Sequence, residues 1–381
     1  MMNYYLNVAL FFLVIFSVKA QTSFVNAQDS LRKVYVLASS QTENLNDENK
    51  AETGIYFLKQ NKDNGKLKLV DNVASISNPT SVKVGKQGKF LYAVSKNTTG
   101  ADEQGFIHTF KILENGNLTE MNKLSTSSWS PRHLALDQSG KFCLISSNGG
   151  EVRLYKIDTD GCLVPHQNIQ ISTKETAQLY GIKLSGDNRF AYIADYGNNK
   201  IWIYKFDAIS GMLTAHEKES AALEAGAGPK NISLSRNGNS LYSVNELNST
   251  ISVFEIDKTG DLKMLEDVST LPENYRWKNS ATDIKMHPTG KFLYASNRGH
   301  NSISIFKIDA ITGKLNYIGF TETLGKIPNS MSIAPLGKFL YATSQNSGHI
   351  SSFKIDEETG KLKLLTTLLE IKNPAAIEIM N

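Results

Sequence analysis

The chain has 381 residues, and its 41 Lys and Arg residues outnumber its 37 Asp and Glu residues by four. Such a weak positive charge argues against a protein that binds nucleic acid or an anionic membrane surface. The two cysteines, Cys143 and Cys162, have no metal-ligand spacing with histidine, so we expect neither a metal site nor a cofactor. We expect free thiols, with a Cys143–Cys162 disulfide as the alternative.

Residues 1–20 are predicted to be a signal peptide. The apolar run VALFFLVIFSV, residues 8–18, is short for a bilayer span, and Val18-Lys19-Ala20 is typical of a cleavage site before Gln21. The first residues carry no Lys or Arg, which leaves an uncleaved anchor as the alternative. We therefore expect a protein exported to the periplasm or secreted, with no membrane insertion after cleavage.

The remaining chain, residues 21–381, repeats one pattern of four short strands with a period of roughly fifty residues, which is typical of propeller blades. In residues 228–265, apolar and β-branched segments alternate with turns rich in Gly, Asn and Asp, the pattern of antiparallel hairpins. Further copies begin at these residues: Asn78, Ser130, Leu179, Ala281 and Pro328.

The two chain ends complete the count of blades. Residues 373–379 have the pattern of a first strand, whereas residues 33–39 and 54–70 have that of the second to fourth strands. We therefore predict an all-β fold, a seven-bladed β-propeller closed by N- and C-terminal strands that share one blade. The polar segment 40–53 is expected to be a mobile loop in that blade, with a lid over a site as the alternative.

Function is expected at one face of the ring. The turns SGK, TGK and LGK before the second strand, and the DxxTGKL turns, barely vary, which indicates a structural role. The loops at the other face differ between blades and converge on the central channel, where we expect a pocket. Their unusual polar residues are the candidates for a site: Arg132, His133, Asp195, Lys230, Asn231, Asn245, Glu246, Arg276, Asp283, Arg298, His300 and Gln345.

The chain resembles the 6-phosphogluconolactonase-like propellers, also called the lactonase family. The residues that carry the resemblance are GAGPKN…NELNST, RWKNSATDI and PTGKFLYASNRGHNSISIF. The resemblance covers essentially the whole mature chain and implies hydrolysis of a sugar-derived lactone. The family usually has GPRH where this chain has Lys230-Asn231, a histidine at Leu179-Tyr180-Gly181 and an arginine at Asn329, whereas Glu246 and Arg298 match.

Lactone hydrolysis requires a base that activates water and cations that stabilise the developing oxyanion. The resemblance and this chemistry imply a catalytic group of Glu246 or His133 as the base with Arg298 and Arg132. The expected substrate-binding residues are Lys230, Asn231, Asn245, Asp283, Asp195, Arg276, His300 and Gln345. For each of these residues the alternative is a purely structural role, in which its side chain only connects loops or neighbouring blades.

Two other functions stay open. One is a non-catalytic binding or scaffold propeller of the cell envelope, which the changed family positions and the signal peptide would suit. The other is lactone chemistry similar to that of carboxymuconate cyclases, a related branch of the family. In each case we expect a small lactone or sugar-like ligand and a monomeric protein.

Overall fold

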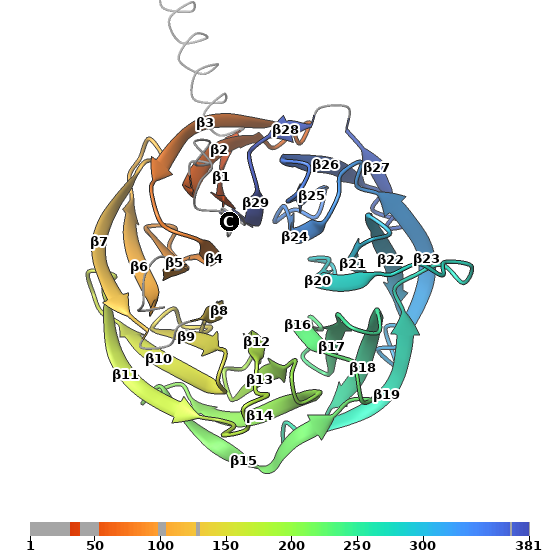
Figure 1. Ribbon diagram of the computed structural model, residues 1–381, viewed down its shortest axis with the longest axis horizontal. Helices are drawn as coiled ribbons and strands as arrows, with labels where there is room; N and C mark the ends of the chain where they lie inside the picture. Colours follow the sequence, from red (N-terminus) through yellow and green to blue (C-terminus); the bar gives the residue numbers. More distant parts are fainter. Residues whose placement is uncertain (1–30, 39–52, 98–103, 127–129, 366–367, 381) are drawn as a thin grey trace, which may run out of the picture.

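The computed structural model describes residues 31–38, 53–97, 104–126, 130–365 and 368–380. The signal segment 1–20 and all of the loop 40–53 except Thr53 lie outside the described residues. The described residues contain no helix, and hence no helix of the length and hydropathy needed to cross a membrane. They form seven antiparallel sheets arranged as blades around one axis (Figure 1), which confirms the predicted all-β propeller.

The closing blade combines both ends of the chain, as predicted, in the strand order β29-β1-β2-β3. Its inner strand β29 pairs antiparallel with β1, with Val34 opposite Ile379 and Val36 opposite Ile377. The strands of this blade are β29 (Pro374–Ile379), β1 (Leu31–Ala38), β2 (Gly54–Asn61) and β3 (Leu67–Ala74). The ring is therefore fastened by backbone hydrogen bonds between two segments more than 300 residues apart in sequence.

Each of the other six blades is a meander of consecutive strands that runs from the axis to the rim. The first three are β4 (Pro79–Val84), β5 (Phe90–Asn97), β6 (Gln104–Ile112) and β7 (Leu118–Ser125); β8 (Pro131–Leu136), β9 (Phe142–Ser147), β10 (Glu151–Ile157) and β11 (Leu163–Gln170); and β12 (Leu179–Leu184), β13 (Phe190–Asp195), β14 (Lys200–Asp207) and β15 (Met212–Ala222). The last three are β16 (Pro229–Leu234), β17 (Ser240–Asn245), β18 (Thr250–Ile256) and β19 (Leu262–Ser269); β20 (Ser280–Met286), β21 (Phe292–Arg298), β22 (Ser302–Ile308) and β23 (Leu315–Glu322); and β24 (Pro328–Ile333), β25 (Phe339–Ser344), β26 (His349–Ile355) and β27 (Leu362–Leu364), with β28 (Leu369–Glu370) also on β26.

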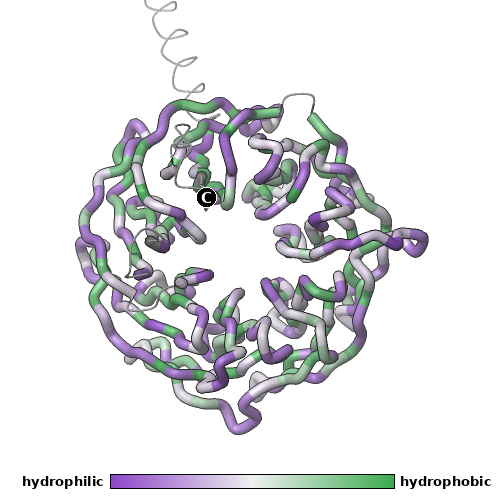
Figure 2. The backbone as a smooth tube through the Cα atoms, viewed as in Figure 1, coloured by the Kyte–Doolittle hydropathy of each residue, from purple (hydrophilic) through white to green (hydrophobic). Residues whose placement is uncertain are grey.

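The core lies between adjacent blades. The second strands β13 and β17 are buried along their whole length, whereas the outermost strands β11 and β19 are largely exposed after a buried first residue. In Figure 2, hydrophilic residues mark the loops that project from the rim. Burial of both faces of the second strands explains their continuous apolar sequence. Both cysteines are free thiols, with Cys143 buried in β9 and Cys162 partly exposed.

The repeated FLYA segment joins neighbouring blades. Six tyrosines of the second strands donate hydrogen bonds of 2.7–3.1 Å to a glycine carbonyl in the outer turn of the next blade. Their hydroxyls belong to Tyr35, Tyr92, Tyr192, Tyr242, Tyr294 and Tyr341. At the acceptor Gly360, which has a φ of 72°, a Cβ atom would lie 2.5 Å from the ring of Phe292. The uniform turns thus serve contact between blades, which is the structural role expected for them.

These contacts predict that two substitutions lower the free energy of unfolding by different amounts. Removal of one buried hydroxyl by Tyr294→Phe should lower the free energy of unfolding by about 1 kcal/mol, because Gly360 O loses its donor. Gly360→Ala should cost more, about 1–3 kcal/mol, because it combines strained backbone with a clash against Phe292. Urea unfolding of both variants measures the difference, and an equal loss in the two variants would contradict the steric argument. Gly238→Ala, whose Cβ would meet no atom within 4 Å, controls for the backbone strain alone.

Candidate active site

Equivalent positions of the inner strands project side chains toward the axis at the same level. The strand registers align them, because one position of each inner strand pairs with a residue near the end of the second strand. The residues at this position are Pro79, Pro131, Leu179, Pro229, Ala281 and Pro328. The residues that follow these positions are Thr80, Arg132, Tyr180, Lys230, Thr282 and Asn329. Each blade adds a residue just after its second strand or at its end, among them Glu246 and Arg298.

Six of these residues make one continuous set of contacts, which we call the polar belt: Arg132, Tyr180, Lys230, Glu246, Arg298 and Asn329. Its centre is Glu246, whose Oε2 lies 2.5 Å from Lys230 Nζ and whose Oε1 lies 3.8 Å from Arg298 Nη1. Arg298 Nη2 donates a hydrogen bond to Asn329 Oδ1. Glu246 and Lys230 belong to one blade, whereas Arg298 and Asn329 come from the next two blades.

Tyr180 extends the polar belt on the other side of Lys230. Lys230 Nζ lies 5.3 Å from the centroid of the Tyr180 ring, and the guanidinium carbon of Arg132 lies 5.0 Å from it. Arg132 Nε also donates to Asn148 Oδ1 at 3.0 Å. Since one phenol ring faces both cations, it holds them apart without neutralising either of them. Three cations and one carboxylate leave the polar belt with a net positive charge.

Burial and the neighbouring charges alter the acidity of these groups. The pKa of Lys230 is lowered to about 8 by burial and by the positive charge of Arg298, although Glu246 opposes this effect. Burial also lowers the pKa of Arg298 and raises that of Tyr180. The buried Nε of Arg298 has no hydrogen-bond partner among the described residues, so this donor is available to an oxygen atom of a ligand. The polar belt thus offers an anchored carboxylate beside donors for an anion.

His133 and Asp283 occupy the next position of the inner strands, and both bond to the neighbouring blade. His133 Nδ1 accepts the backbone N–H of Ile182 at 3.4 Å, and Asp283 Oδ2 accepts that of Met331 at 2.6 Å. Ser81 Oγ accepts the N–H of Leu134 in the same way, at 3.3 Å. Burial and nearby lysines hold the pKa of His133 well below its usual value, in keeping with a neutral ring. This geometry favours the structural alternative for His133 over the role of base.

Asn231 and Asp283 contact each other next to the polar belt, since Asn231 Nδ2 donates to Asp283 Oδ1 at 2.7 Å. Asp195 and Asn245 are fully buried at the ends of second strands and bond to the third strands of their own blades. Asp195 accepts from Trp202 Nε1 at 3.0 Å, and Asn245 donates to Ser252 Oγ at 2.7 Å. Asp195 therefore joins β13 to β14, and Asn245 joins β17 to β18, in the blades that carry Tyr180 and Glu246.

The remaining candidates lie apart from one another. Arg276 is exposed and bonds to carbonyls of its own loop. His300 packs edge-on against Phe320 of the outermost strand β23, with ring centroids 4.6 Å apart, so it covers the outer part of its blade. Gln345 occupies the position equivalent to Glu246 and Arg298; it is buried, and its Oε1 has no partner among the described residues. The structure thus places only Gln345 of these three at the level of the polar belt.

Comparison with known proteins agrees with the fold. The family model described as "Lactonase, 7-bladed beta-propeller" matches residues 35–379. The chain belongs to this lactonase family. It is 31% identical over 294 residues to the 6-phosphogluconolactonase of Formosa agariphila, covering 74% of this chain and 82% of the relative. It is 27% identical over 290 residues to that of Bacillus subtilis, covering 72% of this chain and 79% of the relative.

Solved structures show the same lactonase fold. The periplasmic gluconolactonase of Pseudomonas aeruginosa superposes with a TM-score of 0.82 at 21% identity, over 92% of this chain and 99% of that protein. A putative 6-phosphogluconolactonase from Bacteroides fragilis gives a TM-score of 0.81 at 24% identity, over 93% and 99% of the two chains. The resemblance stated from the sequence is therefore confirmed at the level of the family and its propeller.

Two members of the polar belt, Tyr180 and Asn329, were missed as candidates. They appeared in the sequence only as positions at which the chain departs from the lactonase pattern. Their place in the repeat, equivalent to Arg132 and Lys230, was the signal that would have found them. A tyrosine and an asparagine carry no charge at neutral pH, so charge alone did not single them out.

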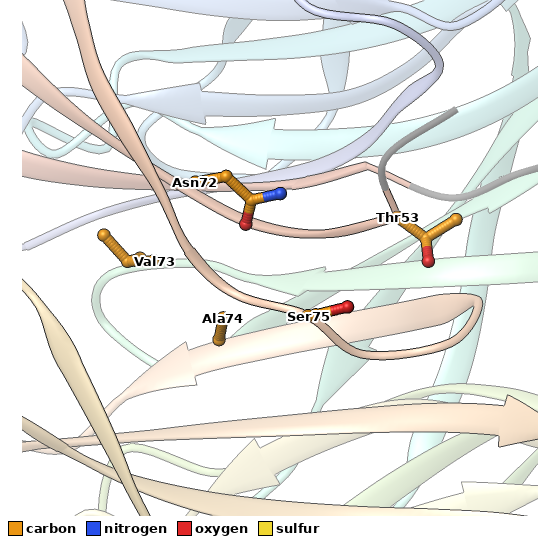
Figure 3. A pocket seen from close by; sticks show the side chains of 5 residues that line it. All are labelled: Thr53, Asn72, Val73, Ala74 and Ser75. Atoms are coloured by element: carbon orange, nitrogen blue, oxygen red, sulfur yellow. The ribbon is translucent and has the colours of Figure 1, made fainter. Parts of the chain in front are cut away.

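Two other features of the described residues lie outside the polar belt. A surface hollow at the end of β3 is lined by Thr53 and by residues 72–75, none of them charged (Figure 3). At the turn between β10 and β11, potential ligand atoms of Asp158, Asp160 and Cys162 lie within 4.8 Å of one another, on largely exposed side chains. Neither feature brings a base and a cation together, so the polar belt is the candidate active site of this lactonase propeller.

Proposed function

We propose that the protein is an exported lactone hydrolase that opens a sugar-derived lactone at the polar belt. The observation that carries the proposal is the contact of Glu246 with both Lys230 and Arg298. A carboxylate that contacts two cations provides a base and an oxyanion site within the reach of one small substrate. Membership of the lactonase family and the relatives named 6-phosphogluconolactonase support the choice of a lactone as substrate.

The proposed reaction begins with a water molecule held by Glu246. As the water oxygen attacks the lactone carbonyl carbon, the carboxylate of Glu246 accepts one proton of the water. The carbonyl oxygen becomes an oxyanion, which Arg298 and the protonated amine of Lys230 stabilise. Collapse of the intermediate breaks the ring C–O bond, and the proton passes from Glu246 to the leaving alkoxide. The product is a hydroxy acid, which releases its carboxyl proton to the solvent, and Arg132 attracts the resulting carboxylate.

A panel of lactones tests this proposal. Hydrolysis by the purified protein is followed with a pH indicator on δ-gluconolactone, 6-phosphogluconolactone and a muconolactone, with the rate of buffer alone subtracted. Turnover of a sugar lactone supports the proposal, and the phosphorylated compound shows whether a phosphate is required. Selective reaction of muconolactone would instead support the cyclase-like alternative. No rate above background on any lactone would favour the binding or scaffold propeller.

Export and the monomeric state belong to the same proposal. The apolar segment 8–18 and the small residues before Gln21 support a cleaved signal peptide, and one structural neighbour is a periplasmic gluconolactonase. The N-terminal residue of protein recovered from the expressing cells tests cleavage, which should leave Gln21 first. Light scattering of the same sample tests the expected monomer.

The low pKa of Lys230 predicts the pH dependence of the reaction. If the protonated amine stabilises the oxyanion, kcat/KM should fall as the pH rises through about 8, because the amine of the free enzyme loses its proton there. Lys230→Arg should retain activity above that pH, since arginine stays protonated. The measurement is kcat/KM from pH 6 to 10 with the background subtracted. A rate that rises through pH 8 would instead identify Lys230 as the base.

A further inference from the structure

A second group of charges lies deeper along the axis, where Lys83, Lys183 and Lys285 occupy the same position of β4, β12 and β20. We call these three residues the lysine cluster. The registers align them, because each faces the tyrosine of its FLYA-type segment on the neighbouring strand. Alternate blades therefore direct an ammonium group toward one axis. The intervening blades place small residues at this level, Ala135, Ser233 and Ser332, and the closing blade places Glu378.

The charges of the lysine cluster are not balanced. Lys83 Nζ pairs with Glu378 at 2.7 Å and Lys285 Nζ with Asp283 at 3.0 Å, whereas Lys183 makes no ion pair or hydrogen bond with any described residue. Asp283 also accepts the N–H of Met331, so its charge is shared. Three ammonium groups and two carboxylates leave one net positive charge. Like charges around one axis repel each other, so the arrangement costs stability unless an anion joins it.

The environment of Lys183 agrees with this imbalance. Burial, followed by the positive charges of Lys83 and Lys285, lowers the pKa of Lys183 to about 7, and Glu378 and Asp283 oppose this effect only in part. The same lysines contribute to the low pKa of His133. Lys183 keeps partial access to solvent, so a small ion can reach it.

The lysine cluster is separate from the polar belt. On β12, Lys183 follows Tyr180 by three residues across an irregularity in the register, which corresponds to at most roughly 10 Å along the strand. His133 and Asp283 lie at the level between the two groups and bond to neighbouring blades. A lactone bound at Glu246 therefore leaves the lysine cluster free for another ligand.

We propose that the lysine cluster binds a small oxyanion, such as sulfate or phosphate, with Lys183 as its principal cation. A tetrahedral oxyanion accepts hydrogen bonds on several sides and suits ammonium groups that converge from different strands. The hydroxyls of Ser233 and Ser332, at the same level on β16 and β24, supply further donors. The bound anion neutralises the remaining positive charge and draws three blades together. This site is independent of the proposed hydrolase activity.

Sulfate is the probe that tests the proposal, since its charge does not change between pH 6 and 9. Thermal unfolding of the purified protein is followed while sulfate is added at constant ionic strength. At pH 6 sulfate should raise the Tm, and Lys183→Met should weaken the apparent sulfate affinity at least tenfold. Lys183→Arg, which keeps the charge, should retain the response, as should Lys263→Met on the exposed strand β19. An equal sulfate response in Lys183→Met and the native protein would overturn the proposal.

The pH and a second anion sharpen the test. The sulfate response of the native protein should be weaker at pH 9 than at pH 6, because Lys183, whose pKa is lowered to about 7, loses its proton between them. A response that does not change with pH would contradict the role of Lys183. Glucose 6-phosphate distinguishes the source of the oxyanion: competition with sulfate indicates that a sugar phosphate fits, and its absence indicates a free inorganic ion. If Lys183→Met does not fold, the pH series of Lys183→Arg still decides the question, because arginine stays protonated and its sulfate response should not weaken at pH 9. An equal weakening in Lys183→Arg and the native protein would overturn the proposal.

Discussion

Glu246→Gln is expected to lower kcat/KM for lactone hydrolysis by about 10²–10⁴-fold. Glutamine keeps the size of the side chain and one carbonyl oxygen for Lys230, but it cannot accept a proton from water. It also removes the negative charge between Lys230 and Arg298, so those two cations then repel each other across the site. The loss should appear mainly in kcat, because the base acts in the transition state.

Glu255→Gln is the matched control for this variant. Glu255 lies on β18 in the same blade, is about half exposed and pairs loosely with Lys263 at 3.6 Å. Its replacement should leave kcat/KM and the Tm unchanged, because an exposed ion pair contributes little. Full hydrolysis by Glu246→Gln, at an unchanged Tm, would show that the base is elsewhere.

Asp283→Ala is expected to lower the free energy of unfolding by about 3–5 kcal/mol, because it leaves a half-buried ammonium group and several donors without their acceptor. The carboxylate is 3% exposed and accepts from Met331 N, Asn231 Nδ2, Ile284 N and Lys285 Nζ. Through them it connects three neighbouring inner strands, β16, β20 and β24. The shift of the midpoint in urea unfolding measures the loss.

Asp63→Ala serves as the control, since Asp63 is an exposed turn residue, and its removal should change stability by no more than about 0.5 kcal/mol. Asp283→Asn should fall between the two, because an amide still accepts the N–H of Met331 but carries no charge for Lys285. If Asp283→Ala were as stable as Asp63→Ala, the bonds between blades at this level would contribute nothing.

The fold could be predicted because the same four-stranded pattern recurs many times in the sequence. Six copies of one four-stranded pattern and two complementary chain ends have one arrangement that completes every blade and closes the ring. The residues at the centre of the candidate site could be predicted from the sequence for the same reason. Lys230, Glu246 and Arg298 lie at positions whose residues differ between blades. Charged residues at such positions near the axis indicate a functional site.

The roles of His133 and Asp283 could not be predicted from the sequence in this way. Each of them bonds to a backbone N–H of the next blade, and the sequence does not reveal how far one blade is shifted along the axis relative to another. Arg276 belongs to the segment between β19 and β20, which joins two blades, and His300 to the hairpin between β21 and β22 of one blade. The sequence did not fix the distance of either side chain from the axis. Packing against Phe320 decided the place of His300.

The closing blade gives the polar belt a property that no single sheet has. The contacts of Arg132 with Tyr180, Tyr180 with Lys230, Glu246 with Arg298 and Arg298 with Asn329 all cross from one sheet to another. Asn329 in turn donates to the carbonyl of Ala375 on β29, which the N-terminal strand holds in place. The alignment of the reacting groups therefore depends on the closed ring. If β1 and β29 no longer paired, the polar belt would lose its alignment and its catalytic activity, although the strands within each of the other blades would still pair.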